Sequence, residues 1–223
     1  MTNIFKNRVF ERFLLWREKF NDYPYRSYMD HHRCIFIHIP KAAGTSVLKV
    51  LAGKKINRDH CSYNIFYQAS RKKFKYYYKF CFVRNPYTRL RSVYQYLKTG
   101  GNGKADLELQ NIIVDRFSTF DEFILEFLDK DLIHQMSLLK PQYAFVCNYK
   151  YDLMVDFCGR FENLHDDFSI VCKNLNIKED LPKLNKTDYE SSDKERALFS
   201  REVLDKINYL YEKDFEIFGY EFE

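Results

Sequence analysis

Glycine and proline are scarce in this sequence, whose 223 residues include 7 glycines and 5 prolines. Together with a hydrophobic content of 46%, this scarcity excludes a disordered chain and indicates an ordinary globular protein. The length suffices for one α/β domain with a full core and is short for two. Because no repeat or linker interrupts the chain, we predict one principal domain over residues 34–223. An N-terminal helix, over residues 4–20, and a lead-in loop are expected within residues 1–33.

Long apolar runs are also missing. Near the start the longest is Phe13-Leu14-Leu15-Trp16, far short of the ~20 residues that a membrane-spanning helix needs. Charges occur throughout residues 1–33, so the sequence predicts neither a secretion signal nor an integral membrane segment. We therefore expect a cytoplasmic protein, of bacterial type.

Paired cysteines and clustered metal ligands are absent from the sequence. None of the six cysteines forms a C-x-x-C pair or has histidine partners at zinc spacing, and the carboxylates do not cluster. We expect reduced core cysteines and no metal. Pairing of some cysteines is the alternative if the chain is exported. The six are Cys34, Cys61, Cys81, Cys147, Cys158 and Cys172.

The excess of one charge sign is small. The chain has 36 Lys and Arg against 31 Asp and Glu, a net charge of +5, which suits an anionic ligand without requiring a nucleic acid. Residues 71–79, R-K-K-F-K-Y-Y-Y-K, form a basic aromatic run. We interpret it as a solvated helix end leading into a strand, with a docking surface for an acidic saccharide as the alternative.

The most informative stretch is C-I-F-I-H-I-P-K-A-A-G-T-S-V-L-K-V-L, residues 34–51. Its first six residues are typical of a buried parallel strand, which Pro40 ends. The small residues Ala42, Ala43 and Gly44 allow a ligand to approach the backbone closely, and the pair Thr45-Ser46 starts a helix. A tight loop between a strand and a helix N-terminus favours a bound phosphate, to which Lys41 would add a positive charge.

This loop differs from the common nucleotide-binding loop. In G-x-x-x-x-G-K-[ST] the lysine follows the second glycine, whereas Lys41 precedes the only glycine here, and the string occurs nowhere else in the chain. ATP or GTP bound in the usual way is therefore not expected.

A second strand-to-helix unit follows at residues 79–97, K-F-C-F-V-R-N-P-Y-T-R-L-R-S-V-Y-Q-Y-L. Phe80–Val83 is predicted to be a buried strand, with Asn85 capping the next helix and proline in its first turn. Arg84 at the strand end and Ser92 about two helical turns on could reach one anion. Two such units favour an α/β fold, a P-loop-like three-layer domain with a central, mostly parallel sheet flanked by helices.

These motifs resemble those of sulfotransferases, specifically the carbohydrate type that includes the heparan sulfate 2-O-sulfotransferases. The segment I-P-K-A-A-G-T-S looks like their 5′-phosphosulfate loop, and V-R-N-P-Y-T-R-L-R-S looks like their 3′-phosphate motif R-[DN]-P-x-x-R-x-x-S. D-H-C-S-Y, residues 59–63, resembles G-H-V-S-Y, which holds the family's catalytic histidine, so His60 is the candidate base. L-P-K-L-N-K-T, residues 181–187, is similar to the loop that closes over the cosubstrate, which implies contacts from Lys186 and Thr187.

The resemblance spans roughly residues 34–218 and implies transfer of the sulfuryl group of 3′-phosphoadenosine 5′-phosphosulfate (PAPS) to a hydroxyl. The expected acceptor is a saccharide, acidic saccharides included. The alternatives are a non-catalytic nucleotide- or polyanion-binding module and a phosphoryl-transferring enzyme, although the latter would need magnesium ligands that the sequence does not show. Eukaryotic Golgi members carry an N-terminal anchor, so a Golgi-lumen catalytic domain with its anchor removed is the alternative location.

Other positions have weaker signals. Gln142 lies in a P-Q element like one on the family's acceptor side, and with nearby His134 it is a weak acceptor-contact candidate; an ordinary loop role is favoured for both. Arg89 and Arg91 are interpreted as helix-surface charges, although Arg89 falls at the second arginine of the 3′-phosphate motif. Further predicted elements are helices at 106–116, 119–129 and 192–214, a strand entered from 138–146, a strand at 153–161, a loop at 23–32 and an aromatic tail at 215–222.

Overall fold

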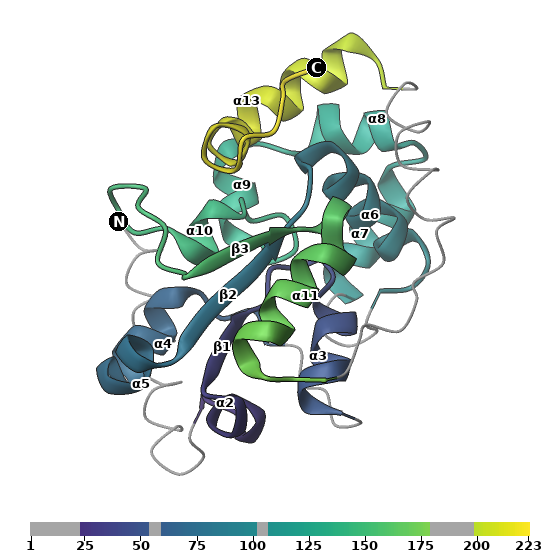
Figure 1. Cartoon of the computed structure of the whole chain (residues 1–223). Helices are drawn as coiled ribbons and strands as arrows, with labels where there is room; N and C mark the ends of the chain where they lie inside the picture. Colours follow the sequence, from purple (N-terminus) through teal and green to yellow (C-terminus); the bar gives the residue numbers. More distant parts are fainter. Residues whose placement is uncertain (1–22, 54–58, 102–106, 179–198) are drawn as a thin grey trace.

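The computed structural model describes residues 23–53, 59–101, 107–178 and 199–223 (Figure 1). The expected N-terminal helix at 4–20 lies outside these residues, as do Lys186 and Thr187. Among the described helices, none combines the length and the apolarity that crossing a bilayer requires.

The core of the fold is a parallel sheet of three strands in the order β1-β2-β3: β1 (Cys34–Ile37), β2 (Tyr78–Val83) and β3 (Phe157–Arg160). Each strand leads into a helix, respectively α3 (Gly44–Ala52), α6 (Pro86–Lys98) and α11 (Leu164–Leu175), the last after a 3-10 turn, η2 (Phe161–Asn163). The predicted α/β architecture, a parallel sheet flanked by helices, is confirmed.

The strand residues alternate between two apolar layers. Phe36, Phe80 and Phe82 pack with α3 and α11 on one face of the sheet. On the other face, Ile35, Ile37 and their neighbours pack against three further helices, α4 (Tyr63–Ala69), α5 (Arg71–Tyr76) and α10 (Tyr143–Val146). This alternation follows from the two-residue period of a strand and produces the three layers visible in Figure 1.

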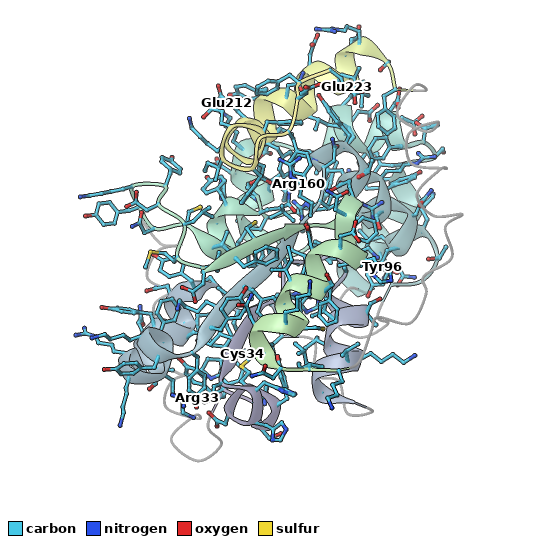
Figure 2. The ribbon with its side chains drawn as sticks, viewed as in Figure 1. Arg33, Cys34, Tyr96, Arg160, Glu212 and Glu223 are labelled. Carbon is cyan, nitrogen blue, oxygen red and sulfur yellow. The ribbon has the colours of Figure 1, made fainter. Side chains whose placement is uncertain are left out.

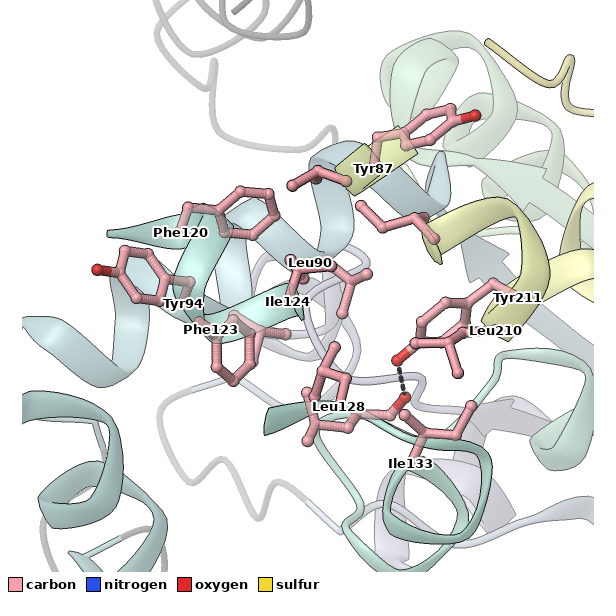
Figure 3. Close-up of a cluster of buried hydrophobic side chains, with 14 of the residues drawn as sticks. Tyr87, Leu90, Tyr94, Phe120, Phe123, Ile124, Leu128, Ile133, Leu210 and Tyr211 are labelled. Atoms are coloured by element: carbon pink, nitrogen blue, oxygen red, sulfur yellow. Dashed lines mark hydrogen bonds between the residues drawn. The ribbon is translucent and has the colours of Figure 1, made fainter. Parts of the chain in front are cut away.

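A helical half extends beyond the sheet. It comprises α6, α7 (Leu107–Arg116), α8 (Phe120–Glu122), the π-helical turn η1 (Phe123–Phe127), α9 (Lys130–Gln135) and α13 (Arg201–Phe218). Their apolar side chains form one cluster, drawn in Figure 3. A capping box joins Thr119 and Glu122 at the start of the helix that the sequence predicts for residues 119–129. The first residues of the predicted aromatic tail belong to α13, where buried Phe215 packs against Tyr87 of α6 at a centroid separation of 5.0 Å, and Phe222 stacks on Phe215 at 4.8 Å.

Two segments differ from the sequence prediction. Residues 23–32, expected as a loop, contain α2 (Ser27–His32), which the Asp30 side chain ties to α5 by accepting from Lys73 and Tyr77. Residues 138–146, expected to lead into a strand, instead lead into and include α10 at residues 143–146, and the N–H groups of Gln142 and Tyr143 at its start donate to the remote Asp214. In both cases long-range hydrogen bonds outweigh local propensity.

The predicted strand at 153–161 is shorter than expected, since β3 occupies only Phe157–Arg160. The last helix extends to Phe218 rather than ending at 214. All six cysteines are free thiols, and five are buried, as expected of core cysteines.

Candidate active site

The loop between β1 and α3 has an unusual backbone. Lys41 and Ala43 both adopt positive φ angles, 64° and 66°, on either side of the buried Ala42. The helix begins at Gly44, one residue before the predicted Thr45-Ser46 start, with Ala43 at the N-cap position. Because the first N–H groups of a helix have no acceptor within the helix, this turn presents backbone donors at its tip.

Gly44 is required by a close approach between the loop and the preceding strand. A Cβ atom at this position would lie 1.7 Å from Nε2 of His38, so no other residue fits while the imidazole stays in place. The His38 ring is 6% exposed and stacks on Phe36 at a centroid separation of 5.7 Å. His38 therefore packs directly beneath the start of α3.

His60 lies beside His38. The centroids of the two rings are 4.4 Å apart, and Nδ1 of His60 lies 3.1 Å from the carbonyl oxygen of His38. A carbonyl oxygen only accepts hydrogen bonds, so Nδ1 is the donor and the basic nitrogen of the neutral imidazole is Nε2.

The neighbours of His60 in the chain are anchored as well. Asp59 accepts a hydrogen bond from Nε of Arg26 at 3.0 Å, and the Sγ atom of Cys61 lies 2.9 Å from the hydroxyl of Tyr23. Both chain neighbours of His60 are therefore fixed by contacts, and His60 itself bonds to His38, just beyond the end of β1. His38, which His60 contacts, also lies against Gly44, so His60 is connected through His38 to the start of α3.

Arg84 follows the last residue of β2. Its Nε donates to the hydroxyl of Thr88 at 3.0 Å, and its guanidinium lies 4.2 Å from the ring centroid of Phe161. Asn85 caps α6 by accepting from the N–H of Tyr87 at 3.0 Å, as predicted. The side-chain cap at the start of this helix is therefore formed by a residue only two positions away.

The Lys41 loop and the Arg84 turn lie at the same edge of the sheet. In the parallel pairing of β1 with β2, Ile37 at the end of β1 is opposite Cys81 near the end of β2, so the loop after β1 and the turn after β2 leave the sheet at the same edge. Figure 2 shows Cys34, the first residue of β1, and Arg160, the last of β3, at opposite ends of the sheet, and the site lies at the Arg160 end. Ligands of open α/β sheets bind at this carboxyl edge.

One face of α6 joins the two halves of the site. Thr88, Ser92 and Tyr96 are four residues apart and so share a helix face. Arg84 contacts the first of them, and Nζ of Lys41 lies 4.2 Å from the ring centroid of Tyr96 (labelled in Figure 2). Half-buried Ser92 lies between these two cation contacts.

Thr88 and Tyr96 are residues of this site that sequence reasoning missed. Their only signal is the four-residue spacing on either side of Ser92, which many amphipathic helices also show. A cation–π contact contributes about 0.5–1 kcal/mol at exposed sites, whereas a hydrogen bond to a charged group contributes about 1.5–3 kcal/mol. A hydrogen bond to a phosphate is therefore strong enough to replace the contacts of Lys41 with Tyr96 and of Arg84 with Phe161.

Two sequence interpretations need correction. Arg89 is not a helix-surface charge: it is fully buried and donates to the carbonyls of Leu138 and Lys140 at 3.2 and 2.9 Å. Gln142 is also fully buried, so a direct acceptor contact is not its role. His134, by contrast, is exposed on α9; the protein atoms that shield part of its imidazole from water and the positive charge of Lys140 both lower the pKa of this side chain.

Comparison with known proteins finds a match over nearly the whole chain. The profile described as the sulfotransferase family matches residues 27–221. Carbohydrate sulfotransferase 14 of Danio rerio is 28% identical over 232 residues, covering 86% of this chain and 60% of that protein. Carbohydrate sulfotransferase 14 of Mus musculus is 30% identical over 166 residues, covering 62% and 43%.

An uncharacterized protein of Archaeoglobus fulgidus is 33% identical over 116 residues, covering 51% of this chain and 80% of that protein. The chain thus spans 60% or less of the two named relatives. No solved structure matches it significantly. The family profile covers nearly the whole chain, including both strand-to-helix units, and the chain belongs to the sulfotransferase family.

Proposed function

We propose that this protein transfers the sulfuryl group of PAPS to a hydroxyl of a saccharide. The observation that carries the proposal is the convergence of two cationic strand-to-helix turns on one face of α6. Lys41 reaches Tyr96 at one end of this face, and Arg84 reaches Thr88 at the other. PAPS matches this arrangement because it carries anionic groups on both its 5′ and 3′ positions.

The residues present fit the 5′ end of such a nucleotide. The turn of Lys41 to Ala43 and the N-terminus of α3 offer backbone N–H groups, and the hydroxyls of Thr45 and Ser46 lie in the first turn of the helix. We assign the 5′ phosphate to Lys41, Ala42, Ala43, Gly44, Thr45 and Ser46.

The 3′ phosphate is assigned to Arg84 and Ser92, with Thr88 added from its contact with Arg84. The guanidinium is the side chain best suited to a phosphate because its planar fork can donate two parallel hydrogen bonds. Contacts from Lys186 and Thr187 stay a prediction, since both lie outside the described residues.

The proposed chemistry uses residues of this chain. PAPS would supply the sulfuryl group, whose bond to the 5′-phosphate oxygen breaks as the acceptor oxygen bonds to sulfur. His60, through Nε2, would take the proton of the acceptor hydroxyl, because its Nδ1 is committed to the His38 carbonyl. Lys41 would offset the charge that develops on the leaving oxygen. Holding the reactants in line would supply much of the rate.

A saccharide acceptor is supported by the names of two relatives, both carbohydrate sulfotransferases, and by the aromatic residues around the site. The rival functions are a phosphoryl-transferring enzyme and a non-catalytic nucleotide- or polyanion-binding module. The former would use ATP with magnesium, and the latter would not depend on His60. The cytoplasmic location stays a prediction.

Ligand-induced stabilisation separates these possibilities. Adenosine 3′,5′-bisphosphate, the product left after sulfuryl transfer, should raise the melting temperature of the chain much more than ATP with Mg²⁺ at the same concentration. Two results would refute the proposed binding of two phosphate groups. One is that the bisphosphate raises the melting temperature no more than adenosine 5′-monophosphate does, and the other is that ATP raises it equally. If adenosine 3′,5′-bisphosphate stabilises the chain as expected, the acceptor is sought by testing labelled PAPS with a panel of polysaccharides, lipids and small alcohols.

A further inference from the structure

The backbone of Arg84 is held by a side chain from a remote segment. The amide oxygen of Gln142 accepts from the N–H of Arg84 at 2.9 Å, and its Nε2 donates to the carbonyl of Arg84 at 2.8 Å. A side chain that pairs with both backbone groups of one residue imitates a neighbouring β-strand. Because β2 ends at Val83, Gln142 supplies at Arg84 the pairing that the sheet supplies to the strand.

Gln142 is itself fixed in position. Its own N–H donates at 2.8 Å to Oδ2 of Asp214, a fully buried residue of α13, and the N–H of Tyr143 donates to the other carboxylate oxygen at 2.9 Å. Arg89 binds the carbonyls of the residues just before this segment. Gln142 is fully buried, so these bonds are shielded from water, which makes such a network rigid.

The next residue along the chain is held in a similar way. Glu162 accepts from the N–H of Asn85 at 2.7 Å, and its second oxygen accepts from the hydroxyl of Tyr220 at 2.9 Å. Both restraints on the turn after β2 therefore lead back to the C-terminal part of the chain, one through Asp214 and the other through Tyr220.

We propose that Gln142 is a positioning residue for the 3′-phosphate arm, which fixes the Arg84 backbone so that the guanidinium is set for the ligand. This inference rests on the proposed function. The Gln142 side chain points at the backbone of Arg84 and is closed off from solvent, so it acts through Arg84 rather than by touching the nucleotide. Asp214 and the helix that carries it thereby become part of the support of the site.

The test compares two nucleotides that differ only in the 3′-phosphate. Affinities of the full chain for adenosine 3′,5′-bisphosphate and adenosine 5′-monophosphate are measured by titration calorimetry. Gln142→Met, which removes both bonds to Arg84 while keeping a similar length, should weaken bisphosphate binding by about tenfold, the worth of one charge-assisted hydrogen bond. Binding of the monophosphate should not change. Gln135→Met, at an exposed glutamine near the end of α9, is the matched control and should change neither affinity.

A double-mutant cycle shows whether the effect passes through Arg84. In an Arg84→Ala background, Gln142→Met should cause no further loss of bisphosphate affinity. A loss that persists without Arg84, or one that is equal for both nucleotides, would mean a general structural role and overturn the inference.

Two further outcomes are decisive. If Gln142→Met does not fold, Gln142→Asn, which keeps the amide but is one methylene shorter, is compared in the same way, and an unchanged preference for the bisphosphate overturns the inference. If the unmodified chain shows no preference for the bisphosphate, the proposed function fails and this inference with it. If the unmodified chain has that preference and both variants retain it, only the positioning role of Gln142 fails.

Discussion

Replacing Gly44 by alanine tests the packing of the phosphate-binding loop directly. The new methyl group would lie 1.7, 1.9 and 2.6 Å from three atoms of the His38 imidazole. Ordinary contacts of a Cβ atom begin at 3.4 Å, so the imidazole must recede by about 3.4 − 1.7 = 1.7 Å, or the loop must move instead. His38 cannot turn freely, because its ring is buried between Phe36 and His60.

The expected cost is that of overpacking a core. Such substitutions typically destabilise by about 1–3 kcal/mol, and the displacement of an entire buried ring favours the upper end. For a chain of this length, about 3 kcal/mol corresponds to a fall in melting temperature of about 6–12 °C. Nucleotide binding should weaken as well, because the new methyl group displaces either the backbone of Gly44, at the start of α3, or the His38 ring beside it.

Chemical and thermal denaturation measure this cost, and a double-mutant cycle tests its cause. His38→Ala removes the imidazole, so the combination of Gly44→Ala with His38→Ala should be more stable than the sum of the two single effects by about 2 kcal/mol. Lys49→Ala, on the exposed side of the same helix, is the control and should change stability little. A Gly44→Ala variant as stable as the unmodified chain, or additive effects in the cycle, would refute the reasoning.

The remaining predictions concern the charged groups. Lys41→Ala and Arg84→Ala should each weaken binding of adenosine 3′,5′-bisphosphate by about ten- to a hundredfold in calorimetry, the worth of a hydrogen bond to a charged group. His60→Ala should preserve that binding and abolish transfer from labelled PAPS; full activity of this variant would rule His60 out as the base. Arg89→Met should lower the free energy of unfolding by about 3–5 kcal/mol in urea denaturation, because it leaves the carbonyls of Leu138 and Lys140 without their buried donor and removes a cation that favours the ionised Asp214 carboxyl. A loss below about 1 kcal/mol would contradict a structural role for Arg89. Each variant has a control at an exposed position that should leave the measured property unchanged. The controls are Lys49→Ala for Lys41, Arg116→Ala for Arg84, His165→Ala for His60 and Arg116→Met for Arg89.

Much of the fold could be predicted because its signals are local. Two apolar strands each followed by a capped helix are visible in the sequence, and Asn85 caps α6 by bonding to a residue only two positions away. The Thr119–Glu122 capping box is equally local. Elements that depend on remote partners were predicted wrongly or missed, such as α2, tied to α5 through Asp30, and α10, held by Asp214.

The candidate site divides in the same way. The residue types and spacing of the two motifs singled out Lys41, Arg84 and Ser92 as candidates, and the resemblance of residues 59–63 to a family segment singled out His60. No spacing could reveal that the imidazole of His38 fills the space beside Gly44, because this contact depends on how the loop folds back on its strand. The roles of Arg89 and Gln142 were hidden for a related reason: a polar side chain is assigned to the surface unless its buried partners, here some 50 to 70 residues away, are known.

The sequence by itself determined the strand-to-helix units and the charged groups that they carry, since strand period, capping and phosphate-loop chemistry act over a few residues. Tertiary structure decided how those units meet. The parallel pairing of β1 with β2 brings the Lys41 loop and the Arg84 turn to the same edge of the sheet, and the direction of α6 lines up Thr88, Ser92 and Tyr96 between the two cations. A buried network anchored on Asp214 holds the Arg84 turn in place, because a turn beyond the end of a strand has no sheet partner of its own.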